Sequence, residues 1–159
     1  MTIKQSFKTG LSFGLTSGII TTLGLVVGLS SGTQSKLVVL SGILVIAIAD
    51  SFSDALGIHI SEESDKRSQG REIWEATLAT FLSKLLVALT FIIPVLFLPL
   101  TFAIVASIFW GLLLISIFSF YLAKEKGEKI GGVILEHLSI AILVVFITHF
   151  FGRWLASFN

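Results

Sequence analysis

The stretch Ala76–Ala123 carries a single charged side chain, Lys84, and this constrains the fold more than any other feature of the sequence. A helix that crosses the hydrocarbon core of a bilayer needs roughly 20 mainly apolar residues, so the stretch is too long for one crossing and suits two. Pro94 and Pro99 lie near its middle. Because proline lacks a backbone donor and disfavours helix in the residue before it, these prolines mark a break. We predict two helices joined by a very tight turn, at about 78–97 and 101–122.

Three further windows are long and apolar enough to cross a bilayer, at about 11–30, 37–60 and 133–152. The chain is 54% hydrophobic and 13% charged, whereas soluble domains contain about 25% charged residues. The sequence therefore predicts an all-α integral membrane protein, a five-transmembrane-helix bundle that forms one domain over 1–159 and is multi-pass in the lipid bilayer. The net charge of +1 offers no basic surface for nucleic acid, and no cysteine is present for a thiolate metal site.

Lysine and arginine are unevenly divided between the two sides of this predicted bundle. Basic residues in short loops mark the cytoplasmic side of a membrane protein. The side with the N-terminus and the predicted loops at about 61–75 and 123–132 carries Lys4, Lys8, Lys66, Arg67, Arg71, Lys124, Lys126 and Lys129. The other side carries Lys36 and Arg153. We predict a cytoplasmic N-terminus and an outside or lumenal C-terminus, in the cell membrane or a vacuole-like organelle membrane.

Asp50 and Asp54 lie four residues apart in the second window, so a helix places both carboxylates on one face. A charged side chain inside a bilayer costs at least about 2.5 kcal/mol on insertion scales, and such residues are functional hypotheses by default. Two stacked carboxylates supply hard oxygen ligands for a divalent cation, or a place to hold and pass a proton. The structural interpretation is an ion pair with Lys84.

Depth in the membrane separates the two aspartates. At about 1.5 Å per residue, Asp54 and Lys84 both lie roughly 9 Å inside the cytoplasmic boundary. Asp50 is one turn deeper, and we expect no basic partner for it at that depth. Lys84 is predicted as a counter-charge or gate rather than a ligand, because an ammonium group offers only donors.

One face of the first predicted helix is rich in small residues, which let helices approach closely in lipid. Ser17 and Thr21 share this face, and hydroxyl groups on a packed face also line a path. We expect the face to pack near the acidic face of the second helix, with Ser17 between the two aspartates in depth. The glycines fall within an arc of roughly 120° and are Gly10, Gly14, Gly18, Gly24, Gly28 and Gly32.

Glu72 and Glu75 lie at the start of the third predicted helix, near the cytoplasmic boundary. Acidic residues suit a helix N-terminus, which is the structural interpretation, and capture of cations at an entrance is the functional one. The sequence contains no phosphate-binding glycine loop, no Gly-x-Ser-x-Gly elbow and no His-Glu-x-x-His motif. It therefore predicts neither an enzyme nor a resident cofactor.

Four segments follow one another in the order found in a known family: TSGIITTLGLVVGLSSG (16–32), SFSDALGIHIS (51–61), FLSKLLVALTFIIP (81–94) and KIGGVILEHLSIAILVVFITHFFGRWL (129–155). In this ordered set the chain resembles the vacuolar iron transporter family. The resemblance implies export of Fe²⁺ or Mn²⁺ from the cytoplasm, coupled to protons, by a homodimer. Family members carry a helical metal-binding insertion after the second helix. Here only 61–75 remains, with Glu72 and Glu75 as possible remnants of that insertion.

The chain departs from this family at the positions that matter for transport. The family's first-helix aspartate and second-helix methionine fall on Ser17 and Asp54, and the glutamate of its Gly-Glu-Tyr motif falls on Ile58. This pattern is compatible with a carboxylate that has moved from the first helix to the second. It is equally compatible with a diverged relative that carries a different ion or none.

Three functions follow from these observations. The leading hypothesis is a divalent-metal antiporter, in which Asp50, Asp54 and Ser17 form an oxygen-rich site near mid-membrane and protonation of the aspartates releases the metal. The second is a non-transporting membrane scaffold or partner subunit with a structural Asp54–Lys84 pair. The third is a proton- or monovalent-cation-coupled carrier of another solute.

Overall fold

The computed structural model describes residues 3–65 and 70–158, which form helices and short turns without any β-strand. The helices are α1 (Ile3–Thr33), α2 (Lys36–Ser64), α3 (Gly70–Thr90), α4 (Ile92–Phe97), α5 (Leu100–Lys126) and α6 (Ile130–Ala156). Because α3 and α4 together form one apolar segment, Gly70–Phe97, the described chain has five helical segments long and apolar enough to cross a membrane. The predicted all-α fold with five long apolar helices is confirmed.

Several helices are longer than the sequence predicts. Helix α2 continues to Ser64 and α3 begins at Gly70, so most of the segment 61–75, predicted as a loop, is helical. Helix α5 likewise continues to Lys126 and ends at Gly127, whose φ of 68° is the left-handed conformation typical of a helix C-cap. Apolar windows mark the part of a helix that suits a bilayer, and charged turns extend it beyond that part. The predicted positions of Lys66 and Arg67, and the side chain of Lys4, lie outside the described residues.

The third apolar segment is interrupted at Phe91, between α3 and α4. Pro94 explains the interruption, because it lacks the N–H group that would bond to the carbonyl of Thr90 one turn earlier. The predicted span at about 78–97 therefore lies within one apolar segment, Gly70–Phe97, that consists of α3 and α4. The very tight turn between the third and fourth spans is confirmed, since only Leu98 and Pro99 separate α4 from α5.

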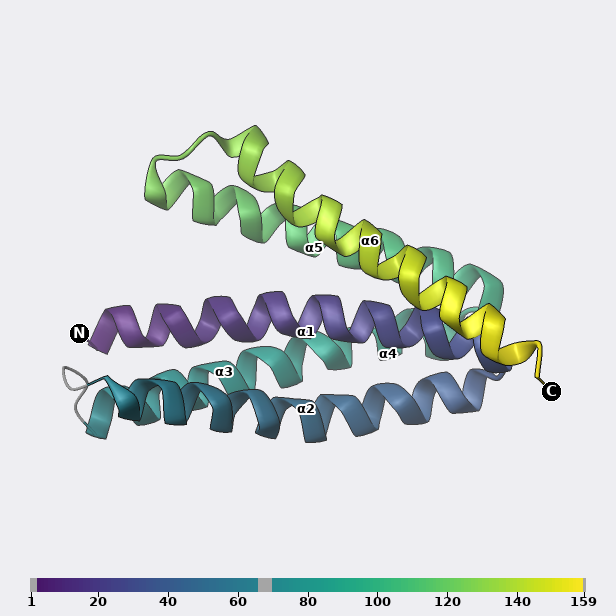
Figure 1. Ribbon diagram of the computed structural model, residues 1–159, viewed down its shortest axis with the longest axis horizontal. Helices are drawn as coiled ribbons and strands as arrows, with labels where there is room; N and C mark the ends of the chain where they lie inside the picture. Colours follow the sequence, from purple (N-terminus) through teal and green to yellow (C-terminus); the bar gives the residue numbers. More distant parts are fainter. Residues whose placement is uncertain (1–2, 66–69, 159) are drawn as a thin grey trace.

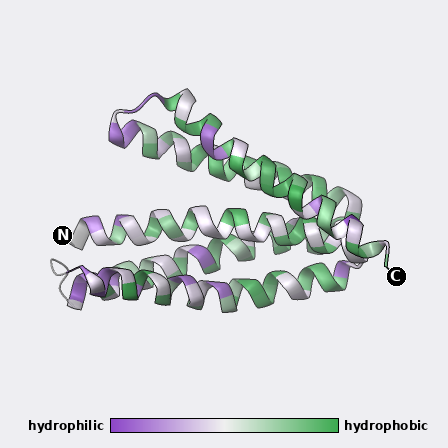
Figure 2. Cartoon of the chain, viewed as in Figure 1, coloured by the Kyte–Doolittle hydropathy of each residue, from purple (hydrophilic) through white to green (hydrophobic). Residues whose placement is uncertain are grey.

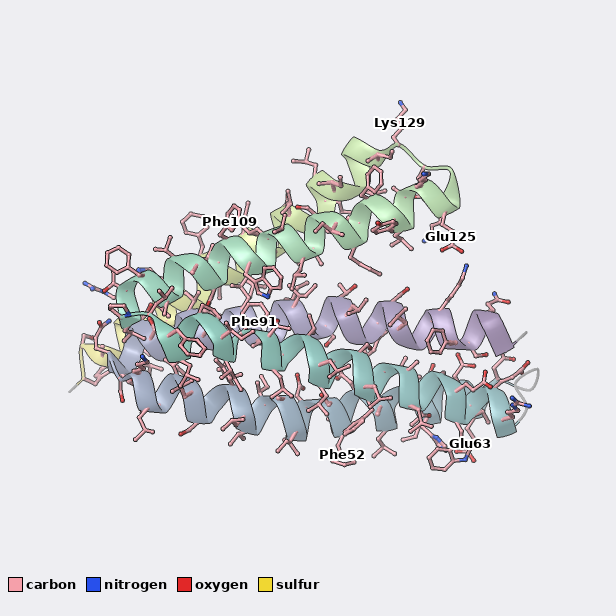
Figure 3. All side chains as sticks on the ribbon, turned by 180° about the vertical axis from the view of Figure 1, so that it is seen from behind. Phe52, Glu63, Phe91, Phe109, Glu125 and Lys129 are labelled. Atoms are coloured by element: carbon pink, nitrogen blue, oxygen red, sulfur yellow. The ribbon has the colours of Figure 1, made fainter. Side chains whose placement is uncertain are left out.

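Helix α1 is central and contacts α2, α3, α5 and α6. In Figure 1, α1, α2 and α3 run side by side, whereas α5 and α6 form a hairpin. This hairpin lies against α1 near the C-terminal end of the molecule and diverges from it toward the end that holds the N-terminus. At that divergent end Lys8 of α1 forms an ion pair with Glu125 of α5, which faces α1 in Figure 3.

The glycines of α1 serve two neighbouring helices rather than one. A Cβ atom at Gly10 or Gly14 would collide with the backbone of α3, and one at Gly18 would lie 2.5 Å from Val87 Cγ1. Farther along, Gly28 and Gly32 approach the backbone and side chains of α6. The expectation that this face packs near the acidic face of α2 is therefore wrong for the glycines, because the N-terminal half of the row packs against α3 and the C-terminal half against α6.

The outside of the bundle is apolar. Figure 2 shows hydrophobic residues over most of α5 and α6, whereas hydrophilic residues gather at the end that holds the N-terminus and the α5–α6 connection. Phe52 and Phe109 point outward and are 62% and 67% exposed, while Phe91 is buried among the helices (Figure 3). Contiguous exposed apolar surface of this extent is unusual in soluble monomers and is compatible with lipid contact.

Candidate cation site

Four polar side chains from three helices meet inside the apolar bundle, and we call them the aspartate–lysine cluster: Ser17 of α1, Asp50 and Asp54 of α2, and Lys84 of α3. Lys84 Nζ forms ion pairs with Asp54 Oδ2 and, at 2.5 Å, with Asp50 Oδ2. It also donates a hydrogen bond to Ser17 Oγ at 2.8 Å. Ser17 Oγ in turn donates to Asp54 Oδ2 at 2.6 Å. The predicted proximity of Ser17 to the acidic face of α2 and the predicted Asp54–Lys84 pair are both confirmed.

The expectation that Asp50 has no basic partner is wrong. Depth alone placed Lys84 beside Asp54, but one helical turn rises only about 5.4 Å and the lysine stem is long enough to span it. The two contacts nevertheless differ in kind. Lys84 donates a hydrogen bond to Asp54, whereas Asp50 Oδ2 is buried and has no hydrogen-bond partner, so Lys84 and Asp50 form an ion pair without hydrogen-bond alignment.

Gly18 explains how a lysine side chain fits here. Lys84 is 1% exposed, and its stem lies against α1 at Gly18. A Cβ atom at Gly18 would lie 3.2 Å from both Cα and Cγ of Lys84, closer than ordinary van der Waals contact. The missing side chain therefore lets α1 approach α3, and it brings the preceding residue, Ser17, within hydrogen-bonding distance of the ammonium group.

The cluster has the chemistry of a cation site that an internal cation already occupies. Asp50 Oδ2, Asp54 Oδ2 and Ser17 Oγ surround the nitrogen of Lys84. With both carboxylates ionised and Lys84 protonated, the cluster has a formal charge of one net negative. Since a low-dielectric interior strengthens charge interactions, this excess charge attracts one further cation or proton.

The other residues predicted to take part lie elsewhere. Thr21 is one turn beyond Ser17, where it lines a separate groove of about 600 Å³ between α1 and α6, and its buried hydroxyl has no hydrogen-bond partner. Glu72 is buried in the first turn of α3. Glu75 forms a salt bridge of 3.2 Å with Arg71, and its buried Oε2 has no hydrogen-bond partner. The predicted metal-binding residues are thus split between the cluster and the start of α3.

No family model matches this chain, and a search of curated proteins finds no match. The resemblance to the vacuolar iron transporters, with the homodimer it implies, stays a prediction. Within residues 3–65 and 70–158, no group of three or more His, Asp or Glu side chains is arranged to hold a metal ion. The three oxygen atoms that the structure does bring together are Asp50 Oδ2, Asp54 Oδ2 and the hydroxyl of Ser17. They surround the ammonium nitrogen of Lys84.

Three histidines that no sequence motif singles out bond to hydroxyl groups on neighbouring helices. His137 Nδ1 lies 2.7 Å from Ser119 Oγ, and His149 Nδ1 lies 2.7 Å from Ser31 Oγ. The Ser119 hydroxyl already donates to the carbonyl of Ile115 on its own helix. The Ser119 oxygen thus contacts both a backbone carbonyl of its own helix and an imidazole nitrogen of α6. His59 bonds to Thr77 in the same way (2.9 Å). No local spacing reveals such pairs, because each partner lies on a different helix.

Proposed function

We propose that this chain is a multi-pass membrane transporter that moves a cation across the bilayer in exchange for protons, with the aspartate–lysine cluster as its binding site. The observation that carries the proposal is the buried ammonium group of Lys84 among three oxygen atoms from α1 and α2. Ionisable groups inside a membrane are typical of ion pathways and proton relays. A purely structural role is a weaker explanation, because apolar residues of similar volume usually stabilise a fold as well as a buried ion pair does.

The proposed membrane placement rests on helix length and on the distribution of basic residues. The five spans have 27 to 29 residues, so at 1.5 Å per residue each is about 40 Å long, enough for a hydrocarbon core of about 30 Å and its headgroup regions. The positive-inside rule then puts the N-terminus in the cytoplasm and the C-terminus outside or in a lumen. At the N-terminal end the described basic residues outside the spans' apolar centres are Lys8, Arg71, Lys124, Lys126 and Lys129, and at the other end Lys36 and Arg153.

In the proposed cycle Lys84 acts as a resident counter-ion. The net negative charge of the cluster attracts a cation, which binds Asp50 or Asp54 and weakens the hold of that carboxylate on the ammonium group. Protons arriving from the outer side then neutralise the carboxylates and release the cation. When the protons leave to the cytoplasm, the carboxylates pair with Lys84 again and the site is reset.

Export of Fe²⁺ or Mn²⁺ is the second candidate function, and one observation favours it. Asp50 Oδ2, Asp54 Oδ2 and Ser17 Oγ already converge on one cation position, and oxygen ligands suit these hard divalent ions. A divalent ion also requires Lys84 to withdraw, because with the ammonium group in place the site would carry one net positive charge. Glu72 and Glu75 then serve as cation-attracting groups at the cytoplasmic mouth.

Flux in proteoliposomes tests the transport proposal. The purified full chain is reconstituted with a pH-sensitive dye inside the vesicles, and Mn²⁺, Fe²⁺ or a monovalent cation is added outside. We expect at least one cation to drive proton movement, and Asp54→Asn to slow it at least tenfold. Glu63→Gln is the matched control, since it removes an exposed carboxylate from the same helix at the cytoplasmic end (Figure 3).

Two results would overturn the proposal. One is that neither a divalent nor a monovalent cation drives proton movement, which is the result expected for a non-transporting scaffold. The other is that Asp54→Asn transports as fast as the parent protein. Ser17→Ala provides a milder second variant if Asp54→Asn does not fold, because it removes one hydrogen bond to each of Asp54 and Lys84 and leaves the ion pairs in place.

A further inference from the structure

A groove beside Asp50 is open to the surface of the α1–α2 pair. Its volume is about 420 Å³, within the range of roughly 300–1,000 Å³ typical of small-molecule sites. Val45 on its rim is 65% exposed, so the groove opens sideways, toward the lipid in the proposed membrane placement. The lining residues are Leu25, Gly42, Val45, Ile46, Ala49, Asp50 and Ser53.

The groove reaches the carboxylate of Asp50 without exposing the lysine behind it. The side chain of Asp50 is 28% exposed, whereas that of Lys84 is 2% exposed. Asp50 Oδ2 is buried against Lys84, so the exposed part of this side chain is turned to the groove. One carboxylate therefore contacts the internal ammonium group on one side and an apolar groove on the other.

Charge and lining together define the occupant. With both carboxylates ionised and Lys84 protonated, the formal charge of the cluster is one net negative, which one monovalent cation neutralises while Lys84 stays in place. A bare metal ion would find few ligands in the groove, because Asp50 and Ser53 supply its only polar side chains and hard cations take six or more oxygen ligands. A cation with an apolar body instead makes van der Waals contacts with the apolar lining and needs no polar ligand beyond the carboxylate.

We propose that this groove binds a lipophilic monovalent organic cation, whose charged centre lies beside Asp50 and whose apolar body covers Leu25, Val45 and Ile46. The inference rests on the proposed cation transport and names its substrate class. The cation enters from the bilayer, competes with a proton for the same negative charge, and leaves the Lys84–Asp54 pair intact.

Equilibrium binding of tetraphenylphosphonium to the purified full chain in detergent tests this inference. We expect saturable binding that Asp50→Asn weakens at least tenfold, since the substitution makes the cluster neutral. Ala49→Leu narrows the groove at an exposed position and leaves every charge in place, so it provides a second variant with the same expected loss. Glu63→Gln, outside the groove, is expected to bind the probe as the parent does.

The outcomes separate this inference from the transport proposal. Equal binding by the parent protein, Asp50→Asn and Ala49→Leu overturns the inference, since the probe then merely partitions into the micelle. Absence of saturable binding overturns it as well. If Mn²⁺ still drives proton movement in vesicles after either result, cation transport stands and only the substrate class is wrong.

Discussion

Removal of the Lys84 ammonium group is the sharpest test of the aspartate–lysine cluster. Lys84→Met keeps a long unbranched side chain but leaves Asp50 and Asp54 one turn apart with no cation between them. Removing one partner of a buried ion pair typically costs about 3–5 kcal/mol. Since the two aspartate side chains are 28% and 19% exposed and keep part of their solvation, we expect a loss near the lower end, about 3 kcal/mol.

A double-mutant cycle resolves which carboxylate holds the lysine more strongly. Asp54→Asn in the Lys84→Met background removes one of the two unpaired charges, so the double variant is expected to lose less stability than the two single losses predict. Contacting residues show coupling energies of about 0.5–3 kcal/mol. We expect the Asp54 coupling to lie in the upper half of that range and the Asp50 coupling to be smaller, because only Asp54 is hydrogen-bonded to Lys84.

Reversible unfolding in mixed micelles of a mild detergent and dodecyl sulfate, followed by circular dichroism, measures these energies. Lys36→Met is the matched control. It removes an ammonium group whose bonds to the carbonyls of Leu96 and Leu98, at 2.9 and 3.1 Å, lie at the exposed end of the bundle. The control is expected to cost less than about 1 kcal/mol. The reasoning is refuted if Lys84→Met unfolds like the parent protein, or if neither aspartate couples to Lys84.

The same unfolding assay tests two packing contacts. Gly152→Ala places a Cβ atom 2.9 Å from Ser31 Cβ and against the backbone of α1, so it should cost about 1–3 kcal/mol. Gly131→Ala meets nothing within 4 Å and is expected to be neutral or slightly stabilising, because alanine forms helix better than glycine. Equal stability of the two variants would contradict the close α1–α6 contact. Thr90→Val removes the acceptor of the 2.9 Å hydrogen bond from Trp110 Nε1. It should cost about 1 kcal/mol and change the tryptophan emission, whereas an unchanged spectrum and midpoint would mean that this bond between α3 and α5 does not form.

The sequence predicts the five long helices well because each depends on a local quantity, the length of an apolar run. It also predicts the pairing of Lys84 with Asp54, because depth along a helix follows from residue count. It does not predict the contact with Asp50, which depends on how α3 is rotated against α2 and on the reach of one side chain. The position of the interruption at Phe91 was not predicted for a different reason. Pro94 removes a hydrogen bond to a carbonyl one turn earlier, so the helix is interrupted before the proline itself.

Two further features could not be predicted from the sequence: the groove beside Asp50 and the division of the α1 glycines between two helices. The groove depends on how α2 lies against α1. The division of the glycines depends on where α3 and α6 lie around α1, and an arc of small residues states only that some neighbour approaches closely. Gly18 illustrates the limit. Its place in the glycine pattern is plain from the sequence, but its role, to make room for the buried stem of Lys84, requires the position of α3.

Ser17 and Asp54 form a direct contact between the first two helices. Ser17 Oγ donates a 2.6 Å hydrogen bond to Asp54 Oδ2. A carboxylate at either position therefore reaches the same place in the bundle. Carboxylates at both would put like charges within hydrogen-bonding distance, which strongly disfavours the ionisation of one of them. A serine at 17 is thus the polar residue that suits Asp54, because its hydroxyl donates to the carboxylate and accepts from Lys84 at once.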